Sequence, residues 1–497
     1  MRRMNGQIWA LSLLVAVGSN GQIPPKPSII AVGPYLQYMT RTNVSILWET
    51  SEAATSVVEY GEQVPLTSRA FVEGQSEMHE VRLERLKPQS CYFYRVLSKG
   101  TSGEESASEV YSFQTAPEDD VAYAFGVVSD TQTNPPVWGR ISTLLFAERP
   151  NFVVHAGDIV GEGDKKEQWT EHFLKPAHKL MSRVPVFAIL GNHDKDHANY
   201  YRYIANPSPE HRYTFTYGNA QFFMIDTNRS VDAVSDQYQW LDHELGRSKA
   251  TWKFAVHHHP PYSSDENDYG DTWKGQSPRG DLKVRPLVKL YEKHGLDMCF
   301  VGHIHDYERT WPIREGKVDS TRGVIYVQAG GAGGGLEDYA PTRSWFTAKV
   351  HRDHHFVIVS ICDRTLQLQA IDQNGVLFDQ LTLRKRGQDH DGRDALGGNL
   401  GGRVDAVAAR HLHVQDHQIR AQQLGQLDGL LPVAGLAHHF VALFAQHLGE
   451  IQPDQRLVLG DQHSPGRARA AVGRGVAHAP HSVVAAGWSN SEGHRLR

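Results

Sequence analysis

Between residues 118 and 386, short apolar runs alternate with longer segments of helical spacing. The runs are rich in β-branched and aromatic residues and cover positions 121–128, 151–155, 184–190, 251–256 and 296–301. The intervening segments place apolar residues three and four positions apart, at 138–148, 169–181, 236–245 and 285–294. Three more strand-like stretches, 356–360, 366–370 and 376–383, close the region. This order predicts an α/β domain in which helices cover a mixed pair of sheets.

Residues 27–117 follow a different pattern, with apolar side chains at every second position. The alternating stretches are 44–48, 56–60, 79–83 and 92–96, and Gly, Pro, Ser and Asn separate them. Short strands with such turns predict a small all-β sandwich. Taken alone, this pattern indicates only an adhesive or spacer module.

Each of the five apolar runs ends at a short polar block. The blocks are Ser129-Asp130-Thr131-Gln132, Gly157-Asp158, Gly191-Asn192-His193-Asp194, His257-His258-His259-Pro260-Pro261-Tyr262 and Gly302-His303-Ile304-His305. Because ligands gather beyond the carboxyl ends of strands in α/β sheets, we expect all five to converge on one sheet edge. Two cations about 3.5–4 Å apart need a bridging carboxylate and several nitrogen and oxygen donors. The blocks together supply such a set.

No block taken alone identifies a metal site. Gly157-Asp158 is a common turn sequence. Three successive histidines cannot all face one site, because alternate side chains of a strand point to opposite sides. His303 and His305 stand two apart, which favours the same side. The prediction of a binuclear metal centre therefore depends on the whole set.

Residues 118–386 resemble the calcineurin-like metallophosphoesterases, and the string from Gly302 to Thr310 is most similar to purple acid phosphatases. The resemblance implies an α/β fold, a four-layer αββα sandwich. It also implies that Asp158 bridges two metal ions, that Asn192, His258 and His303 complete one site, and that Asp130 and His305 hold the other. His193 is implied as the catalytic residue beside the leaving group. His258 is preferred within its run because the pattern His-x-Pro-x-Tyr extends from it to Tyr262, so His259 is a possible metal ligand or neighbour of one.

The amino-terminal region is similar to the fibronectin type III-like domain that precedes the catalytic domain of plant-type and bacterial purple acid phosphatases. Leu86-Lys87-Pro88 and Tyr92-Phe93-Tyr94-Arg95 carry this resemblance. It implies an all-β sandwich domain over residues 27–117 ahead of a catalytic domain over residues 118–386.

The chain departs from the family pattern at two positions. Gly161 stands where purple acid phosphatases have a metal-binding tyrosine, and Gln132 stands where other calcineurin-like enzymes have a histidine. Gln132 is either a ligand through its amide oxygen, which suits Mn²⁺ or Mg²⁺, or an amide facing the second shell or the substrate. Asp194 either orients the His193 imidazole or serves as a turn residue. The expected cofactors are two divalent ions or iron with a divalent ion, drawn from Fe, Mn, Zn and Mg.

Composition narrows the possible partners. The chain of 497 residues has a formal net charge of −5 and a pI near 6.6, so it lacks the basic surface expected for nucleic acid or anionic membranes. We expect a small-molecule phosphate ester as substrate, with no nucleic acid and no stable membrane partner. The sequence does not indicate an oligomeric state. Its three cysteines imply no disulfide framework.

The two ends of the chain carry separate signals. Arg2 and Arg3 precede an apolar stretch at 8–17 and small residues, which predicts a signal peptide at 1–21 and a secreted or periplasmic protein; an uncleaved anchor is the alternative. Residues 387–497 contain no Lys, Tyr, Met or Cys but many Gly, Ala, Arg, Gln and His. This composition predicts a low-complexity, disordered tail without an assigned function.

These observations predict an exported phosphatase that hydrolyses phosphate monoesters by in-line attack of a metal-bound hydroxide. A phosphodiesterase or nucleotide-cleaving enzyme of the same fold is one alternative, and a secreted binding module with a degenerate metal site is another. Leaving-group contacts come from loops such as 263–279 and 330–344, whose composition indicates only exposure.

Overall fold

The computed structural model describes residues 28–118, 121–266 and 279–385. The predicted signal peptide at 1–21, the predicted tail at 387–497 and most of the loop at 263–279 lie outside the described residues.

The amino-terminal domain is all β, as predicted. Its strands are β1 (Ile30–Gln37), β2 (Val44–Gly61), β3 (Ser68–Leu83), β4 (Cys91–Lys99), β5 (Glu105–Ala107) and β6 (Tyr111–Gln114). The sequence predicted separate strands at 44–48 and 56–60, but β2 passes through both, because register shifts around Ala54 bend it without ending it. The first half of β2 pairs with β1 and the second half pairs with β4, so this one strand belongs to two antiparallel strand pairs.

A neutral histidine lies in the core of this domain. The ring of His79 stacks on fully buried Trp48, with ring centroids 4.7 Å apart and planes 10° apart. Thr50 Oγ1 lies 2.9 Å from its Nε2, and Ser56 Oγ lies 2.7 Å from its Nδ1. Burial lowers the pKa of His79 to about 4. The imidazole is therefore uncharged in the folded domain at neutral pH.

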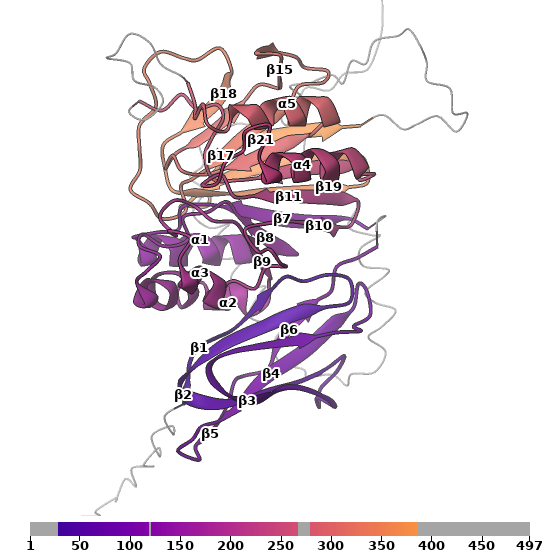
Figure 1. The fold of residues 1–497 in the computed structure, drawn as a ribbon, viewed down its shortest axis with the longest axis vertical. Helices are drawn as coiled ribbons and strands as arrows, with labels where there is room; N and C mark the ends of the chain where they lie inside the picture. The colour runs from indigo at the N-terminus through magenta and orange to yellow at the C-terminus, as the bar shows by residue number, and fades with distance from the viewer. Residues whose placement is uncertain (1–27, 119–120, 267–278, 386–497) are drawn as a thin grey trace, which may run out of the picture. The chain divides into compact units, whose positions relative to one another are not determined.

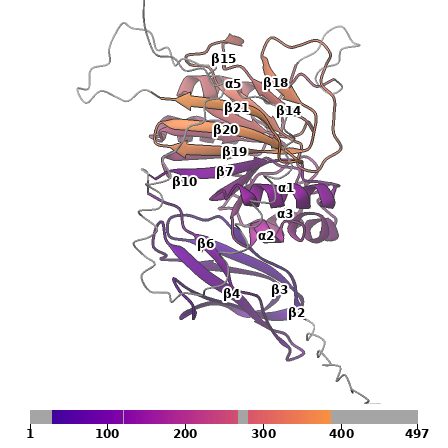
Figure 2. The same cartoon turned by 180° about the vertical axis from the view of Figure 1, so that it is seen from behind.

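The second domain contains two sheets that pack face to face. Its first sheet has the order β21 (Leu377–Arg384), β20 (Thr365–Asp372), β19 (His355–Cys362), β7 (Tyr123–Val128), β8 (Phe152–His155) and β9 (Val186–Ala188), and β9 pairs in turn with β1. Its second sheet has the order β10 (Arg212–Tyr217), β11 (Ala220–Ile225), β12 (Trp252–Val256), β13 (Met298–Val301), β17 (Ile325–Ala329), β14 (Tyr307–Thr310) and β18 (Thr347–His351). A small ribbon, β15 (Ile313–Arg314) with β16 (Lys317–Val318), stands apart from both. Figure 2 shows β19, β20 and β21 beside β7.

Aromatic side chains fill the space between the two sheets. Phe125 of β7 stacks on Phe152 of β8 with centroids 5.2 Å apart and meets Phe222 of β11 edge to face at 5.0 Å. Phe254 and Phe300 extend the same cluster from β12 and β13. Strands buried on both faces read as continuous apolar runs, which explains why the sequence pattern identified them.

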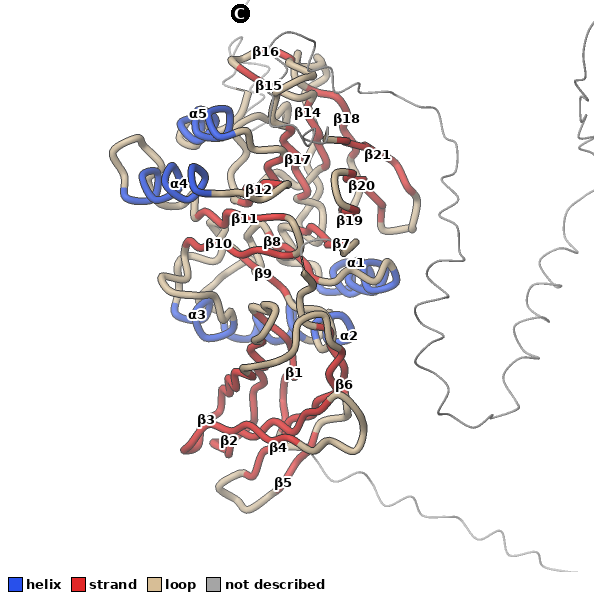
Figure 3. Tube along the Cα trace, turned by 90° about the vertical axis from the view of Figure 1, so that its right-hand side faces the viewer, coloured by secondary structure: helices blue, strands red, loops and turns tan. Residues whose placement is uncertain are grey.

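Helices cover the outer faces of both sheets (Figures 1 and 3). The first sheet is covered by α1 (Pro135–Ala147), the π-helix η1 (Gln168–Leu174), α2 (His178–Met181) and α3 (Ala198–Tyr203), and the second by α4 (Asp236–Arg247) and α5 (Arg285–His294). The predicted helix at 169–181 is broken, because Pro176 has no N–H to donate and its ring disfavours a continuous helix. The predicted four-layer αββα sandwich is confirmed.

The expectation that all five polar blocks converge on the edge of one sheet is wrong. Three of the polar blocks follow β7, β8 and β9 in the first sheet, whereas the other two follow β12 and β13 in the second. The blocks therefore meet across the two sheets. Among the described residues, no helix is both long and apolar enough to cross a membrane.

The neutral state of His79 predicts a pH dependence of stability. An unfolded histidine titrates near its ordinary pKa of 6.5, so below that pH the unfolded chain binds more protons than the folded chain. The free energy of unfolding should fall as the pH drops from 6.5 towards 4, with His79 contributing about 1–2 kcal/mol between pH 7 and pH 5.

Urea unfolding of the full chain and of His79→Gln at both pH values measures this contribution. The variant should lose less stability on acidification than the parent does. A control variant at the exposed His243, His243→Gln, should follow the parent. Equal losses in parent and His79→Gln would exclude the proposed titration.

Candidate metal centre

Three residues of the polar blocks have an unusual backbone conformation. Asp130, Asp158 and His303 have φ values of 57°, 52° and 74°. Non-glycine residues seldom adopt this left-handed region, and each such residue costs on the order of 1–3 kcal/mol. The rest of the fold stabilises these conformations, which direct the three side chains towards the site.

Two glycines allow the loops to approach one another. A Cβ atom at Gly191 would overlap the backbone nitrogen and Oδ1 of Asp158, and one at Gly302 would overlap Ser129 Oγ. Any larger residue would push the loops that carry Asp158 and Asp130 away from their neighbours.

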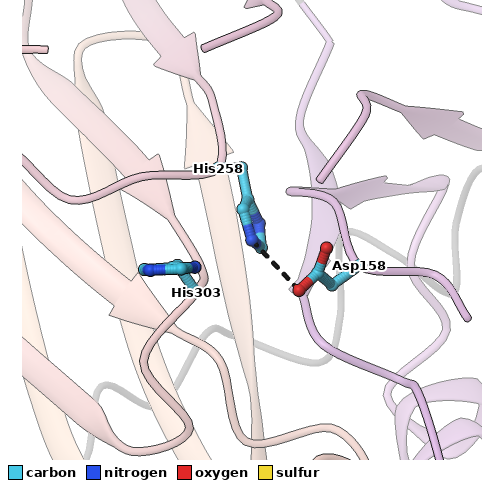
Figure 4. Close-up of side chains that lie close together, drawn as sticks. All are labelled: Asp158, His258 and His303. Atoms are coloured by element: carbon cyan, nitrogen blue, oxygen red, sulfur yellow. Dashed lines mark ion pairs between the residues drawn. The ribbon is translucent and has the colours of Figure 1, made fainter. Parts of the chain in front are cut away.

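The first half of the site joins the two sheets. His258 Nε2 lies 3.2 Å from Asp158 Oδ2 and 3.0 Å from Asn192 Oδ1. His303 Nδ1 lies 2.9 Å from Asn192 Oδ1. Ligand atoms of Asp158, His258 and His303 all lie within 4.8 Å of one another (Figure 4). These distances suit a single cation between the side chains.

A hydrogen bond orients the His258 imidazole, and the Asp158 charge stabilises its protonated form. Its Nδ1 lies 3.0 Å from the Ala156 carbonyl oxygen, and a proton donated there leaves Nε2 directed at Asp158. Burial disfavours a charged imidazole, but the Asp158 carboxylate still raises the pKa of His258 above its ordinary value. Burial likewise opposes the charge of Asp158, and His258 holds the pKa of that carboxyl below its ordinary value. A cation would replace the proton in this buried pair.

The second half of the site contains Asp130 and His305. His305 Nε2 lies 3.5 Å from Asp130 Oδ1, and its Nδ1 lies 2.7 Å from the Gly335 carbonyl oxygen. A proton donated to Gly335 leaves the Nε2 lone pair on the side of Asp130. Asp130 also accepts hydrogen bonds from the backbone N–H of His303, at 3.0 Å to Oδ2. That bond connects the two halves.

Gln132 lies beside His305. Its Nε2 is 3.0 Å from His305 Nε2, and its Oε1 is buried and has no hydrogen-bond partner among the described residues. Rotation of the amide by half a turn would place the oxygen where the nitrogen lies now. The unpaired oxygen fits a metal ligand, and the bond to His305 fits a supporting amide, so both interpretations of Gln132 stay open.

His193 lies at the exposed rim of this arrangement. Its backbone N–H donates to Asp158 Oδ1 at 2.8 Å, and its ring Nδ1 lies 2.8 Å from the Gly161 carbonyl oxygen. Donation from Nδ1 fixes the ring and leaves Nε2 as the nitrogen available for chemistry. Gly161, whose identity departs from the family pattern, thus contributes its carbonyl group.

Asp194 acts on the loops and not on His193. Its Oδ1 accepts from the backbone N–H of Ile159 at 3.0 Å and of Val160 at 3.3 Å, and its Oδ2 accepts from Gly191 at 2.8 Å. Burial and the nearby Asp158 charge raise its pKa. Of the two roles considered for Asp194, these contacts fit the turn role, because the carboxylate holds together the loops that carry Asp158 and Asn192.

Only one member of the histidine run contacts Asp158. His257 is fully buried, with Nε2 3.1 Å from Cys299 Sγ. His259 is partly buried, with Nδ1 2.8 Å from Thr227 Oγ1 and its ring centroid 4.6 Å from that of His303. His259 therefore neighbours the site without an Asp158 contact.

The structure adds residues that the sequence analysis missed. Glu337 Oε2 accepts a hydrogen bond from the backbone N–H of His305 at 2.7 Å. Thr227 orients His259 from the loop after β11. Neither residue belongs to a motif, because each reaches the site through tertiary packing and not through its sequence neighbours.

The donor set fits a pair of metal ions. Carboxylate, imidazole and amide-oxygen donors suit iron and several divalent ions, among them Mn, Zn and Mg. Asp158 has Oδ2 near His258 Nε2, while its Oδ1 accepts a hydrogen bond from the backbone N–H of His193.

Comparison with known families agrees with this geometry. Residues 123–307 match the calcineurin-like phosphoesterase family, and residues 31–115 match the purple acid phosphatase N-terminal domain.

Similar proteins carry related names. Purple acid phosphatase 21 of Arabidopsis thaliana is 27% identical over 351 residues, which cover 62% of this chain and 75% of that protein. Acid phosphatase type 7 of Mus musculus is 26% identical over 392 residues, covering 68% of this chain and 87% of that protein. Probable inactive purple acid phosphatase 27 of Arabidopsis thaliana is 24% identical over 361 residues, which span 63% of this chain and only 58% of that protein.

Among solved structures, purple acid phosphatase PPD1 from yellow lupin (Lupinus luteus) shares the fold, with a TM-score of 0.64 and 20% sequence identity. The match covers 71% of this chain and 74% of the lupin chain. The chain thus contains a calcineurin-like phosphoesterase domain preceded by a purple acid phosphatase N-terminal domain, and proteins similar to it are named purple acid phosphatases.

Proposed function

We propose that this protein is an exported phosphatase that hydrolyses phosphate monoesters of small molecules at a binuclear metal centre. The observation that carries the proposal is the convergence of Asp158, His258 and His303 within 4.8 Å, beside the Asp130–His305 pair. Some similar proteins are named as inactive, so family membership alone does not decide activity. Oxygen and nitrogen donors from all five polar blocks favour an active centre, although Gly161 and Gln132 stand where the family has a tyrosine and a histidine.

The proposed ligand roles are those that the family resemblance implies. Asp158 would bridge the two ions; Asn192, His258 and His303 would complete one site; Asp130 and His305 would hold the other, with Gln132 as its ligand or its neighbour. When bound, two cations lower the pKa of a water molecule and neutralise the phosphoryl oxygens. Fe, Mn, Zn and Mg are the candidate ions.

The chain itself supplies the proton for the leaving group. His193 has its Nδ1 against the Gly161 carbonyl oxygen and its backbone N–H on Asp158, so its position relative to the centre is fixed. A protonated Nε2 at the exposed rim donates to the departing alkoxide. Asp194 contributes indirectly by holding the loops that carry Asp158 and Asn192.

The export component of the proposal depends on the amino-terminal sequence. Arg2, Arg3 and the apolar stretch at 8–17 have the composition of a signal peptide, which supports a secreted or periplasmic location.

The bridging role of Asp158 predicts a combined loss. Asp158→Asn removes the charge shared by both ions, so metal content and phosphatase activity should fall together, the activity by roughly 100-fold or more, since even neighbours of metal ligands are worth 10–100-fold. Elemental analysis and monoester turnover of the full chain measure both. Asp232→Asn, at an exposed carboxylate, is the matched control and should change neither. Retention of both ions with normal turnover would refute the ligand assignment.

A different outcome is expected for His193. His193→Ala should keep the metal ions but lose on the order of 10²–10⁴-fold in rate for alkyl phosphates, whose leaving groups need a proton. The loss should be much smaller for nitrophenyl phosphate, because its leaving group departs without protonation. Rates across a leaving-group series, together with metal analysis, test this role. A loss independent of the leaving group would eliminate it.

A further inference from the structure

A second cluster of metal-binding side chains lies outside the centre described above. It consists of His351 at the end of β18, Asp353 in the loop to β19 and Asp372 at the end of β20. One ligand atom from each lies within 4.8 Å of the others. None of the three belongs to the polar blocks of the sequence analysis.

The carboxylates of Asp353 and Asp372 are each held in place by hydrogen bonds to one of their two oxygens. Asp372 is 7% exposed, and its Oδ1 accepts from the backbone N–H of Asn374 at 2.8 Å and of Val376 at 3.0 Å. Asp353 Oδ1 accepts from the His354 N–H and from Gln373 Nε2, both at 2.7 Å. Within the described part of the chain, neither Oδ2 atom accepts a hydrogen bond. Each carboxylate is thus fixed while one of its oxygens stays available for a ligand.

The imidazole of His351 is also fixed, and its Nε2 atom lacks a hydrogen-bond partner among the described residues. Its ring stacks on Phe378, with centroids 4.0 Å apart and planes 24° apart, and its backbone pairs with Tyr307. The Nε2 atom is shielded from solvent and forms no hydrogen bond with any described residue. A buried polar atom without a partner costs about 1–3 kcal/mol. A bound ligand would remove that cost.

The charge of the cluster favours a cation. Asp353 and Asp372 lie close together, and no lysine or arginine of the described residues forms an ion pair with either carboxylate. The nearest basic residue in sequence, Arg352, pairs with Asp338 at 2.7 Å instead. Two neighbouring carboxylates without a compensating side chain attract a positive ion.

We propose that His351, Asp353 and Asp372 form a third metal site, which binds a divalent transition-metal ion such as Zn²⁺. One imidazole and two carboxylates are a mixed donor set typical of Zn²⁺ and its neighbours, whereas Ca²⁺ and Mg²⁺ prefer oxygen alone. Three protein ligands leave a position for water.

The position of this site suggests what the ion does. The backbone N–H of His355 donates to the Gly331 carbonyl oxygen at 3.1 Å, so the loop after Asp353 adjoins the glycine-rich segment 330–335. Gly334 of that segment donates to the Asp130 carbonyl oxygen at 2.8 Å. An ion at Asp353 therefore braces the loop that supports Asp130, as a structural ion and not a catalytic one.

Zinc stoichiometry tests the proposal. The full chain is dialysed against zinc buffered by a chelator, which removes weakly held ions, and its zinc is counted by elemental analysis. Asp372→Asn preserves the backbone hydrogen bonds of the turn, because an amide oxygen accepts as a carboxylate oxygen does, but it removes the charge. Asp372→Asn and His351→Gln should each bind one zinc ion fewer than the parent.

Asp363→Asn is the matched control, because Asp363 is an exposed turn carboxylate between β19 and β20 and should leave the zinc content unchanged. Circular dichroism checks that each variant is folded. Equal zinc content in the parent, Asp372→Asn and His351→Gln would overturn the third site.

A double variant separates this site from the proposed binuclear centre. Asp158→Asn should keep the third zinc ion, and Asp158→Asn combined with Asp372→Asn should lose it. If Asp158→Asn binds zinc as the parent does while Asp372→Asn still loses one ion, the binuclear proposal fails and the third site stands. If the double variant retains as much zinc as Asp158→Asn alone, the third site is wrong.

Discussion

The buried pair of Asp158 and His258 is the interaction on which the site depends. Asp158 follows β8 in one sheet and His258 follows β12 in the other, and their atoms meet at 3.2 Å with both side chains almost completely buried. A buried carboxylate without a partner costs several kcal/mol, so each residue constrains where the other lies. The pair therefore fixes the two sheet edges relative to each other, and an arriving cation takes over the role of the imidazole proton.

The surrounding backbone is arranged to keep this pair in place. Left-handed conformations at Asp130, Asp158 and His303 and close approaches at Gly191 and Gly302 all destabilise the loops locally. Asp194 offsets part of that cost by accepting three backbone hydrogen bonds. These buried hydrogen bonds keep the strained loops in one conformation, so the metal-binding side chains are already in position before a metal ion binds. Little rearrangement of these side chains is then needed during catalysis.

Local sequence patterns predicted the features that depend on neighbouring residues. Strands buried on both faces read as apolar runs, and the polar residue after each run marked the sheet edges that carry Asp158 and His258. The pattern did not show that these edges belong to two sheets, nor that β2 is one bent strand, because pairing partners lie far away in the sequence. The sequence analysis also missed Glu337 and the cluster of His351, Asp353 and Asp372, because their contacts join residues that lie apart in the sequence. The bridging role of Asp158 and the role of His193 stay predictions.

X-ray absorption spectroscopy of the metal-loaded full chain tests the central claim most directly, because it reports the distance between the ions themselves. The account predicts scattering from a second metal at about 3.5–4 Å, with only nitrogen and oxygen in the nearest shell. Spectra without a metal–metal contribution, or with sulfur ligands, would contradict a binuclear centre built around Asp158.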